Sequence, residues 1–342
     1  MADVISDVLN QSLWEAKNSS YAKQAAYRLE ALRFFGATME VDERYDVGDT
    51  YTTKLISRDN NMADSVKAGS RNYKQGLPDS VESFVQAYDR LGKYLSWTEN
   101  DELKLQEALN RLRGDPIGNY NAFLEGVTEK SPRRLIEAFY RAVDAEIWFG
   151  KANKDLISQK FDNNIEPNLT NIPSLMTANP ANKVTTNGVG THPKIARVAA
   201  NNLFTAANAK IAANQIKDIN LEMITKCGFG VNRVILPADV AQDVDQSATT
   251  LELKTLTELL KPVMPDVEVI ASETMLRYGI KDAIVFHYST NYYDNVCSCR
   301  LSQFALKEKF DIDTWEIHGY GVCGGLEVKI PDGIKIITGI KS

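Results

Sequence analysis

Between Asp46 and Gly150 the chain reads VGDTYTTKLISR (47–58), then NNMADSVKAGSRNYKQGLPD (60–79), then SFVQAYDRLGKYLSWT (83–98). The outer segments have strand character, and the middle one is charged and glycine-containing. Ordering such an extended pair costs about 1–2 kcal/mol per residue in backbone entropy, with little apolar surface of its own to offset that. The stretch therefore predicts an extended arm that lies on another subunit. The alternative is a long surface loop with a hairpin, although loops of this length are uncommon in compact domains.

A long helix is predicted at the end of this stretch, from Ser131 to Gly150. Ser131 suits the N-cap, Pro132 the first turn and Gly150 the C-terminal cap. Between these ends runs an apolar stripe at helical spacing, formed by Leu135, Ile136, Phe139, Tyr140, Val143 and Ile147. The opposite face is expected to be polar and carries Arg133, Arg134, Glu137, Arg141, Asp144 and Glu146. At 1.5 Å per residue, about 18 residues give a rod of roughly 27 Å.

The N-terminal region also has helical periodicity. Residues 2–35 place apolar side chains on one face, and Gly36 is suited to end the helix. One interpretation is an N-terminal arm that lies on a neighbouring subunit, with Trp14 among its contacts. The other is a helix packed on the core of its own chain, because the amphipathic pattern is the same in both cases.

Shorter helices and a strand-rich C-terminal half complete the expected organisation. Helices are predicted at 101–113, 194–216 and 251–260, and an irregular stretch rich in Asn, Pro, Thr and Gly at 162–193. Short β-rich runs fill the tail, and Pro331-Asp332-Gly333 is predicted to turn a hairpin between the last two. Helices followed by mixed strands with an inserted helix indicate an α+β fold rather than a regular βαβ array.

The composition is that of an ordinary globular protein. Among 342 residues, 44% are hydrophobic and 25% are charged, and the formal net charge is −6. Such an acidic chain lacks the basic face that a dedicated DNA- or RNA-binding protein needs. No apolar run is long enough to span a bilayer, and the N-terminus MADVISDVLNQSLWEAKNSS has no uninterrupted apolar core. We therefore expect no membrane association, no secretory signal and folding in a cytoplasm.

Four cysteines are the residues most able to carry chemistry, and so few in a long chain suit reduced thiols. Cys297, Cys299, His318 and Cys323 could in principle bind zinc, but their spacing does not match paired ligand motifs. Nothing in the sequence places a histidine base beside Cys227, so a nucleophile is not predicted there. The chain also lacks a glycine-rich phosphate-binding motif. We predict no catalytic residue, no metal site and no cofactor.

Basic side chains of the predicted arm are candidates for contacts with acidic groups on a neighbouring subunit. Solvated surface charge is the alternative interpretation for each of them. Together with Trp14, the predicted inter-subunit residues are Lys54, Arg58, Lys67, Arg71 and Lys74.

The order of these elements resembles the major capsid protein of tailed bacteriophages, with the Hong Kong 97-type fold. Beyond the arm and the long helix, the resemblance rests on NRVILPADVAQDV (232–244), PDVEVIASETM (265–275), DAIVFHYS (282–289) and WEIHGYGVCGGLEVKIPDGIKIITGI (315–340). The last run resembles a peripheral strand, a glycine-marked crossing and a final strand that returns to the axial domain. The resemblance implies an N-terminal arm at 1–36, an extended β-hairpin loop at 37–98, a peripheral domain at 99–193 and 295–330 with a spine helix at 131–150, and a mixed-sheet axial domain at 194–294 and 331–342.

This resemblance implies a structural subunit rather than an enzyme. Such subunits self-assemble into pentamers and hexamers of an icosahedral viral capsid, which encloses double-stranded DNA without sequence-specific binding. The implied partners are further copies of the chain, a separate scaffolding protein, a portal protein and a decoration protein. The implied location is the virion capsid, assembled in the host cytoplasm. Three alternatives stay open. One is an encapsulin-like compartment with the same fold, and another is a cytoplasmic cysteine- or zinc-dependent enzyme using Cys297, Cys299, His318 and Cys323. The third is a non-capsid virion protein, such as a tail or decoration component, for which a shorter, more β-rich chain without the spine-helix signal is expected.

Overall fold

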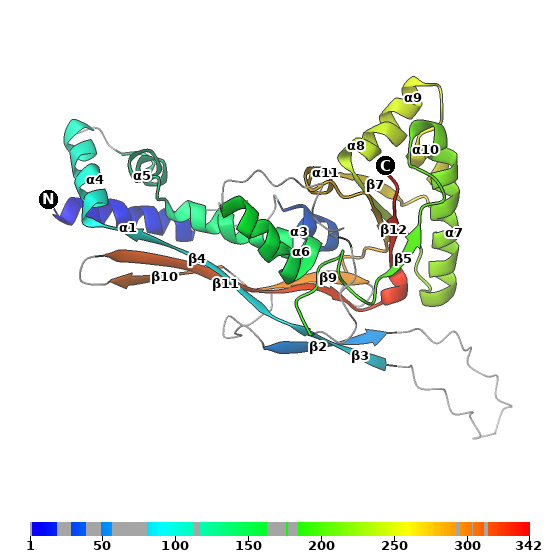
Figure 1. Cartoon of the computed structure of the whole chain (residues 1–342), viewed down its shortest axis with the longest axis horizontal. Helices are drawn as coiled ribbons and strands as arrows, with labels where there is room; N and C mark the ends of the chain where they lie inside the picture. The colour runs from blue at the N-terminus through cyan, green and yellow to red at the C-terminus, as the bar shows by residue number, and fades with distance from the viewer. Residues whose placement is uncertain are drawn as a thin grey trace, which may run out of the picture.

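The computed structural model describes residues 2–18, 29–38, 49–56, 81–112, 117–162, 176, 184–291, 295–302, 304–310 and 314–342. These residues form an elongated molecule with two lobes (Figure 1). One lobe is a long sheet with helices on one face, and the other is a second sheet packed against further helices. The mixture of helices and two sheets confirms the predicted α+β fold class. In the described parts of the chain, no helix has the length and apolar character needed to cross a membrane.

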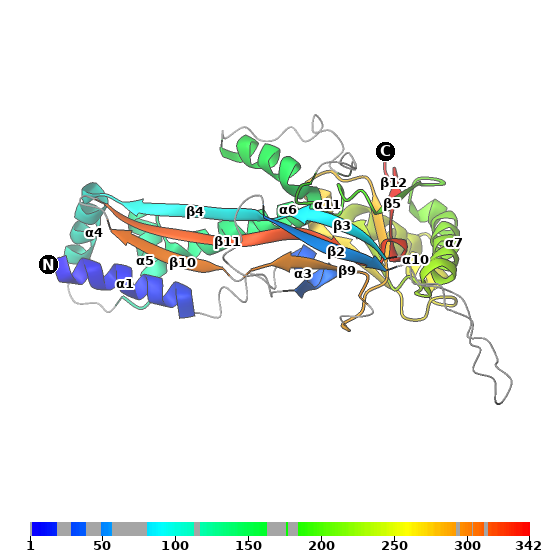
Figure 2. The same cartoon turned by 90° about the horizontal axis from the view of Figure 1, so that it is seen from below.

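The first sheet is built around β11 (Trp315–Val328), a strand of 14 residues. One edge of β11 pairs with two successive strands, and the other edge pairs with a single long antiparallel strand. Seen from below, the strands lie in front of the helices that cover the opposite face (Figure 2). The strands around β11 are β10 (Ala305–Phe310), β9 (Cys297–Leu301), β4 (Asp89–Trp97) and, parallel to β9, β1 (Ala37–Thr38).

Helices pack on the outer end of this sheet through one apolar cluster, called the outer cluster. The outer cluster joins Trp97 and Trp315 of the sheet, whose ring centroids are 4.9 Å apart, to buried side chains of the surrounding helices. Of these helices, the one at 120–128 was not predicted, and the predicted helix 101–113 begins two residues earlier. The helices are α1 (Ala2–Asn18), α4 (Glu99–Leu112), α5 (Tyr120–Thr128) and α6 (Pro132–Asp162).

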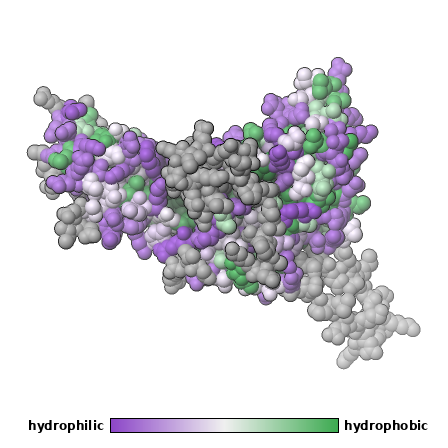
Figure 3. Space-filling model, viewed as in Figure 1, coloured by the Kyte–Doolittle hydropathy of each residue, from purple (hydrophilic) through white to green (hydrophobic). Residues whose placement is uncertain are grey.

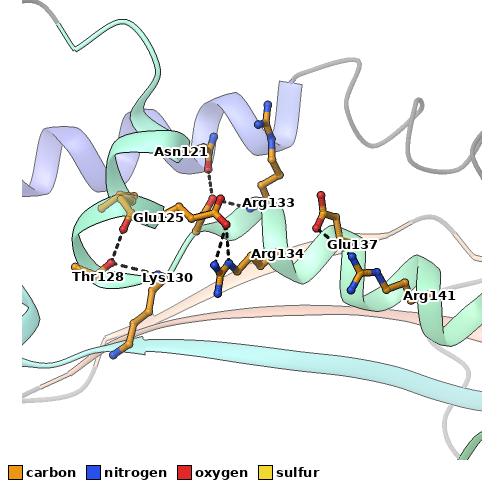
Figure 4. Close-up of polar contacts among 10 residues, drawn as sticks. Asn121, Glu125, Thr128, Lys130, Arg133, Arg134, Glu137 and Arg141 are labelled. Atoms are coloured by element: carbon orange, nitrogen blue, oxygen red, sulfur yellow. Dashed lines mark hydrogen bonds and ion pairs between the residues drawn. The ribbon is translucent and has the colours of Figure 1, made fainter. Parts of the chain in front are cut away.

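The long helix α6 begins as predicted. The Oγ of Ser131 accepts a hydrogen bond from the backbone N–H of Arg133 at 3.3 Å and donates one to Oδ1 of Asn121 at 2.8 Å. Arg134 pairs with Glu125 of α5 at 2.8 Å, so the α5–α6 corner is fixed by polar contacts (Figure 4). The N-cap and the proline in the first turn are therefore confirmed.

Gly150 interrupts α6 but does not end it. Its φ of 74° and ψ of 166° are not helical, and the helix resumes and continues to Asp162. The predicted end at Gly150 is therefore a kink, because the backbone conformation that glycine allows there is followed by a second helical segment. The predicted polar face is also wrong at one position, since Glu146 is fully buried.

The N-terminal region packs on its own chain. Val8, Leu9 and Leu13 of α1 are buried in the outer cluster. A second helix, α3 (Glu30–Phe35), is buried between the two sheets and ends at Gly36, as predicted. Of the two interpretations, the structure therefore shows the second for residues 2–18 and 29–36, because both segments pack on the core of their own chain.

The second sheet has the strand order β5-β12-β8-β6-β7. The pairs β12–β5 and β6–β7 are parallel, whereas β8 is antiparallel to both β6 and β12. The sheet is therefore mixed, as expected for the axial domain. Its strands are β5 (Ala196–Ala199), β6 (Arg233–Pro237), β7 (Glu268–Ser272), β8 (Ala283–Phe286) and β12 (Ile334–Thr338).

Helices of this lobe differ from the prediction at two places. The predicted helix 194–216 contains strand β5 in its first part, and the helix itself starts only at Ala209. The predicted helix 251–260 starts at Leu256, where Thr255 and Glu258 form a capping box. The elements are η2 (Ala206–Asn208), α7 (Ala209–Cys227), α8 (Ala238–Ala241), η3 (Gln242–Ser247), α9 (Ala248–Thr250), α10 (Leu256–Leu260) and α11 (Glu273–Arg277).

The segment Pro331–Gly333 turns the chain but does not form the predicted hairpin. It is a single 3-10 turn, η4, between β11 and β12. These strands belong to different sheets, so the turn carries the chain from one lobe to the other. Proline and glycine determine the local turn, but they do not determine which sheet the next strand joins.

Candidate assembly surfaces

A two-stranded hairpin stands apart from the two main sheets. It consists of β2 (Thr50–Ile56) and β3 (Val81–Ala87), paired antiparallel from Thr50 and Ala87 to Ile56 and Val81. In Figure 1 it lies below the long sheet, on the side opposite the helices, and seen from below it lies in front of that sheet (Figure 2). The chain then passes into β4 of the first sheet, so the predicted loop 37–98 includes two strands, β1 and β4, that belong to that sheet.

Four of the five basic candidates for inter-subunit contact lie outside the described residues: Arg58, Lys67, Arg71 and Lys74. Lys54 is described and is exposed on β2. Trp14 lies on α1 of the first lobe, with 58% of its surface exposed. It lines a surface hollow of about 460 Å³ together with Tyr120 of α5 and polar residues of α1. Trp14 and Lys54 therefore belong to two separate surfaces.

The inner face of β2 is fixed to β11 by buried polar contacts. The Tyr51 hydroxyl donates a hydrogen bond to the carbonyl of Gly324 at 2.7 Å, and Thr53 Oγ1 donates one to Glu327 at 3.1 Å. The Arg300 guanidinium lies 4.4 Å from the Tyr51 ring centroid and 3.2 Å from Glu327. Burial, and next the charge of Glu327, raise the pKa of Tyr51, so the hydroxyl remains a hydrogen-bond donor.

The inner face of β3 is fixed in the same way. Gln86 Nε2 donates a hydrogen bond to the Leu326 carbonyl at 3.0 Å, and Phe84 packs on the ring of His192 at 5.0 Å. His192 is buried, and Nδ1 accepts a hydrogen bond from the Lys194 backbone N–H at 3.2 Å. Burial, followed by the nearby charges of Arg197 and Lys194, lowers the pKa of His192 to about 3. The imidazole is therefore neutral at physiological pH and acts as a packing residue.

The exit of the hairpin is tied to the kink of α6. Asp89, the first residue of β4, forms ion pairs with Lys151 and, at 2.7 Å, with Lys154. Glu146, from the other side of the kink, lies 3.3 Å from Lys154. Burial alone would raise the pKa of Asp89, but the hydrogen bonds and charges of the two lysines outweigh it and lower that pKa. Burial raises the pKa of Glu146 well above its usual value.

These contacts fix the orientation of the hairpin relative to the long sheet. Each strand is held through an inward-facing side chain, Tyr51 or Gln86, to the backbone of the same stretch of β11. Buried hydrogen bonds of this kind favour one arrangement of the strands that they join. The β2–β3 pair is therefore held at a defined angle to the long sheet.

Sequence reasoning missed Asp89, Glu146 and Lys154. Glu146 lies three positions after Val143 and directly before Ile147, at the edge of the apolar stripe. That periodicity was the available signal for its burial. Asp89 carried no such signal, because the two lysines that pair with it are more than 60 positions away in the sequence.

The cysteines do not form the catalytic or metal-binding constellation of the enzyme alternative. Cys297, Cys299 and Cys323 are fully buried. His318 instead stacks on Tyr94 at 5.4 Å and contacts Glu316 at 2.9 Å. Across the described ranges, no group of three or more Cys, His, Asp or Glu side chains could hold a metal ion.

Cys227 has ordinary structural contacts. Its thiol donates a hydrogen bond to the Met223 carbonyl at 3.1 Å, one turn earlier in α7. His287 stacks on Phe229 at 4.8 Å, and its Nδ1 contacts the Gly230 carbonyl at 2.8 Å. These contacts describe a packed thiol and a packed imidazole rather than a nucleophile and its base.

Solved structures that are similar to this chain include capsids and a virus-like particle. The capsid of Myoviridae phage XM1 matches with a TM-score of 0.51 and 15% identity, over 90% of this chain and 92% of that one. A virus-like particle from Pyrococcus furiosus matches with a TM-score of 0.45 and 12% identity, over 93% and 96% of the two chains. The capsid of an empty GTA particle matches with a TM-score of 0.46 and 10% identity, over 92% and 97%.

No protein-family model and no curated protein matches the sequence. Of the three structures, the phage XM1 capsid has a TM-score above 0.5, and the assignment of the fold rests on it. The chain therefore has the fold of a tailed-phage capsid protein over nearly its whole length, as the sequence resemblance implied.

Proposed function

We propose that this chain is the structural subunit of an icosahedral viral capsid that encloses double-stranded DNA. In this proposal it assembles as pentamers and hexamers and has no enzymatic role. The observation that carries the proposal is the capsid fold across 90% of the chain, shared with the phage XM1 capsid. The fixed orientation of the β2–β3 pair supports it, because Tyr51 and Gln86 hold this two-stranded element against β11, outside both main sheets.

The proposed domains follow the sheets, with a changed boundary. The first sheet and α4 to α6 would be the peripheral domain, and the second sheet with α7 to α11 would be the axial domain. Strands β1 and β4 move from the extended loop to the peripheral domain, because they pair with β9 and β11. The proposed extended loop then begins and ends at the β2–β3 pair.

Charge supports enclosure of DNA rather than tight binding. A net charge of −6 does not favour condensation on phosphates, whose neutralisation requires many Lys and Arg contacts. The proposed partners are other copies of the chain, a scaffolding protein, a portal protein and a decoration protein, within a virion assembled in the host cytoplasm.

Negative-stain electron microscopy of the expressed protein, alone and with the products of neighbouring genes, tests the proposal. We expect closed shells of uniform diameter. A protein that stays monomeric in every combination and concentration would overturn it. Cargo inside shells made without phage components would instead favour a compartment of the encapsulin type.

The proposed inter-subunit role of the sequence between β2 and β3 is tested by deleting Asn60–Asp79. We expect folded subunits that no longer close into normal shells, because residues 60–79 are proposed to supply contacts to the neighbouring subunit. Reversing charge at Lys54, Arg58, Lys67, Arg71 and Lys74 should have the same effect in weaker form. Lys104→Glu, on an exposed face of α4, is the matched control and should assemble normally. Normal shells from the deletion variant would exclude residues 60–79 as an assembly element.

A further inference from the structure

The outer face of α7 carries exposed apolar side chains. Leu221 is 65% exposed, and Ile211 and Ile224 are 42% and 46% exposed. At 100° per residue, Leu221 lies near the middle of the exposed arc and the two isoleucines lie toward its edges. The opposite arc is buried against the second sheet and its neighbours through Ala212, Ala213, Ile216, Ile219 and Met223.

A second exposed apolar site lies at the end of α9. Leu251 and Leu253 are 61% and 43% exposed on either side of Glu252. The hydropathy surface has apolar side chains at the top of this lobe, where Figure 1 places α9 (Figure 3). We call Leu251–Leu253 the tip. In the same view, α7 runs down the outer edge of the lobe, so the tip and the α7 face are two different surfaces.

The backbone holds the tip in one conformation. The N–H of Leu253 donates to the Ala248 carbonyl at 2.8 Å, and the N–H of Glu252 donates to the Thr249 carbonyl at 3.1 Å. This pair of bonds is a Schellman motif, in which the residue at the position of Glu252 adopts the left-handed region. Glu252 has a φ of 59°, although glycine would adopt it at a lower cost. The tip therefore presents two leucines and one carboxylate in a preformed geometry.

The two surfaces are complementary in charge. Residues 238–266, which contain the tip, carry six carboxylates and two lysines. On the outer side of α7, the half-buried Lys217 lies one turn from Leu221 and the exposed Lys210 about three turns away, and the exposed acid Asp218 lies on the same side. Among the acids of α7, Glu222 is already engaged by Lys226 at 2.8 Å and by Lys335. Docking of the tip would bring Glu252 toward the lysines while its leucines cover the apolar centre of the α7 face.

We propose that the tip of one copy docks on the α7 face of the next copy, in a head-to-tail contact that closes rings. The occupant of each surface is thus a second copy of this chain. A head-to-tail interface uses two different patches on each subunit and closes when the rotation between subunits divides a full turn. Leu221 and Leu253 are the proposed central pair. This inference rests on the proposed capsid function and specifies its contact within each pentamer and hexamer.

Cysteine cross-linking tests the pairing directly. The four native cysteines are buried, so accessible thiols come from the variant. The double variant Leu221→Cys/Leu253→Cys is assembled, treated with an oxidant or a short bis-maleimide, and analysed on non-reducing gels. We expect a ladder of covalent oligomers that ends at pentamers and hexamers, with neither single variant giving a ladder.

Two outcomes would overturn the pairing while leaving the capsid function intact. One is cross-linked dimers from Leu253→Cys alone, which would mean that tips meet tips. The other is normal shells from the double variant, seen by electron microscopy, without a ladder. If the unmodified protein forms neither rings nor shells, the proposed function and the pairing both fail, so the two failures are distinguishable.

A second variant keeps the inference testable if the cysteine pair disturbs assembly. Leu251→Ser/Leu253→Ser should reduce the assembled fraction at least tenfold at fixed protein concentration, with unchanged circular dichroism. Leu103→Ser is the matched control, because Leu103 is 54% exposed on α4 in the other lobe. Equal assembly of the tip variant and the control would overturn the inference.

Discussion

The carboxylate of Glu146 and the ammonium of Lys154 meet at 3.3 Å across the kink of α6. The glutamate is fully buried, and the same ammonium lies 2.7 Å from Asp89 of β4. One lysine therefore joins both segments of the kinked helix to the strand that follows the hairpin. The bend in the helix and the start of β4 are therefore coupled through Lys154, and Lys151 adds a second ion pair to Asp89.

Replacing Asp89 with Asn should destabilise the subunit by about 3–5 kcal/mol, because Lys151 and Lys154 would lose the charge that compensates their partial burial. Urea unfolding followed by circular dichroism measures the change. Glu137→Gln is the control, since Glu137 pairs with Arg141 at 3.8 Å on the surface and should cost at most about 0.5 kcal/mol. Equal effects of the two substitutions would mean that the buried network contributes nothing specific.

His192 should make the subunit less stable in acid. Its pKa is about 3 in the folded chain and about 6.5 when unfolded, so between these values the unfolded state binds a proton that the native state excludes. The contribution is thus present above pH 6.5 and is lost as pH falls toward 3, by up to about 1.4 kcal/mol per pH unit. Unfolding free energies from pH 7 to pH 4 should fall less steeply in His192→Gln. Parallel curves for the two proteins would contradict this.

The features that sequence could predict are those set by neighbouring residues. Ser131 and Pro132 begin α6 because a cap and a first-turn proline act within one helical turn. The strand character predicted for residues 47–58 is confirmed by β2, in which Tyr51, Thr53 and Leu55 are all buried on one face.

The features that sequence reasoning missed depend on distant partners. Residues 196–199 form a strand because they pair in parallel with β12, about 140 positions away, although the region was predicted as helix. The helix beyond Gly150 was missed for a similar reason. Its restart is supported by contacts of Lys151 and Lys154 with Asp89, which no local pattern contains.

All four thiols should be unreactive in the folded protein. Burial raises the pKa of Cys297 to about 12 and that of Cys299 and Cys323 well above the usual value, and Cys227 is also buried. A chromogenic disulfide reagent at pH 8 should therefore detect no thiol in native protein and four after denaturation. Rapid labelling of one or more cysteines in native protein would show that the packing around β9 or α7 opens readily.

The kink of α6 is closed by a segment that passes close to it. A kink leaves helical carbonyls without their usual donors, and here the N–H of Val189 donates to the Ile147 carbonyl at 2.7 Å and the N–H of Gly190 to that of Trp148 at 3.0 Å. A Cβ on Gly188 would lie 2.4 Å from the backbone nitrogen of Gly150. Backbone atoms on both sides of the contact leave no side chain to move aside.

Gly188→Ala should therefore destabilise the subunit by more than about 3 kcal/mol or prevent folding, because it separates the segment from the kink. Gly126→Ala is the matched control. Gly126 lies within α5 with open space around its Cα, so alanine should raise stability by about 0.5–1 kcal/mol through helix propensity. Thermal unfolding of both variants gives the comparison. A melting temperature of Gly188→Ala equal to that of the unmodified protein would show that the segment and the kink are not in contact as described.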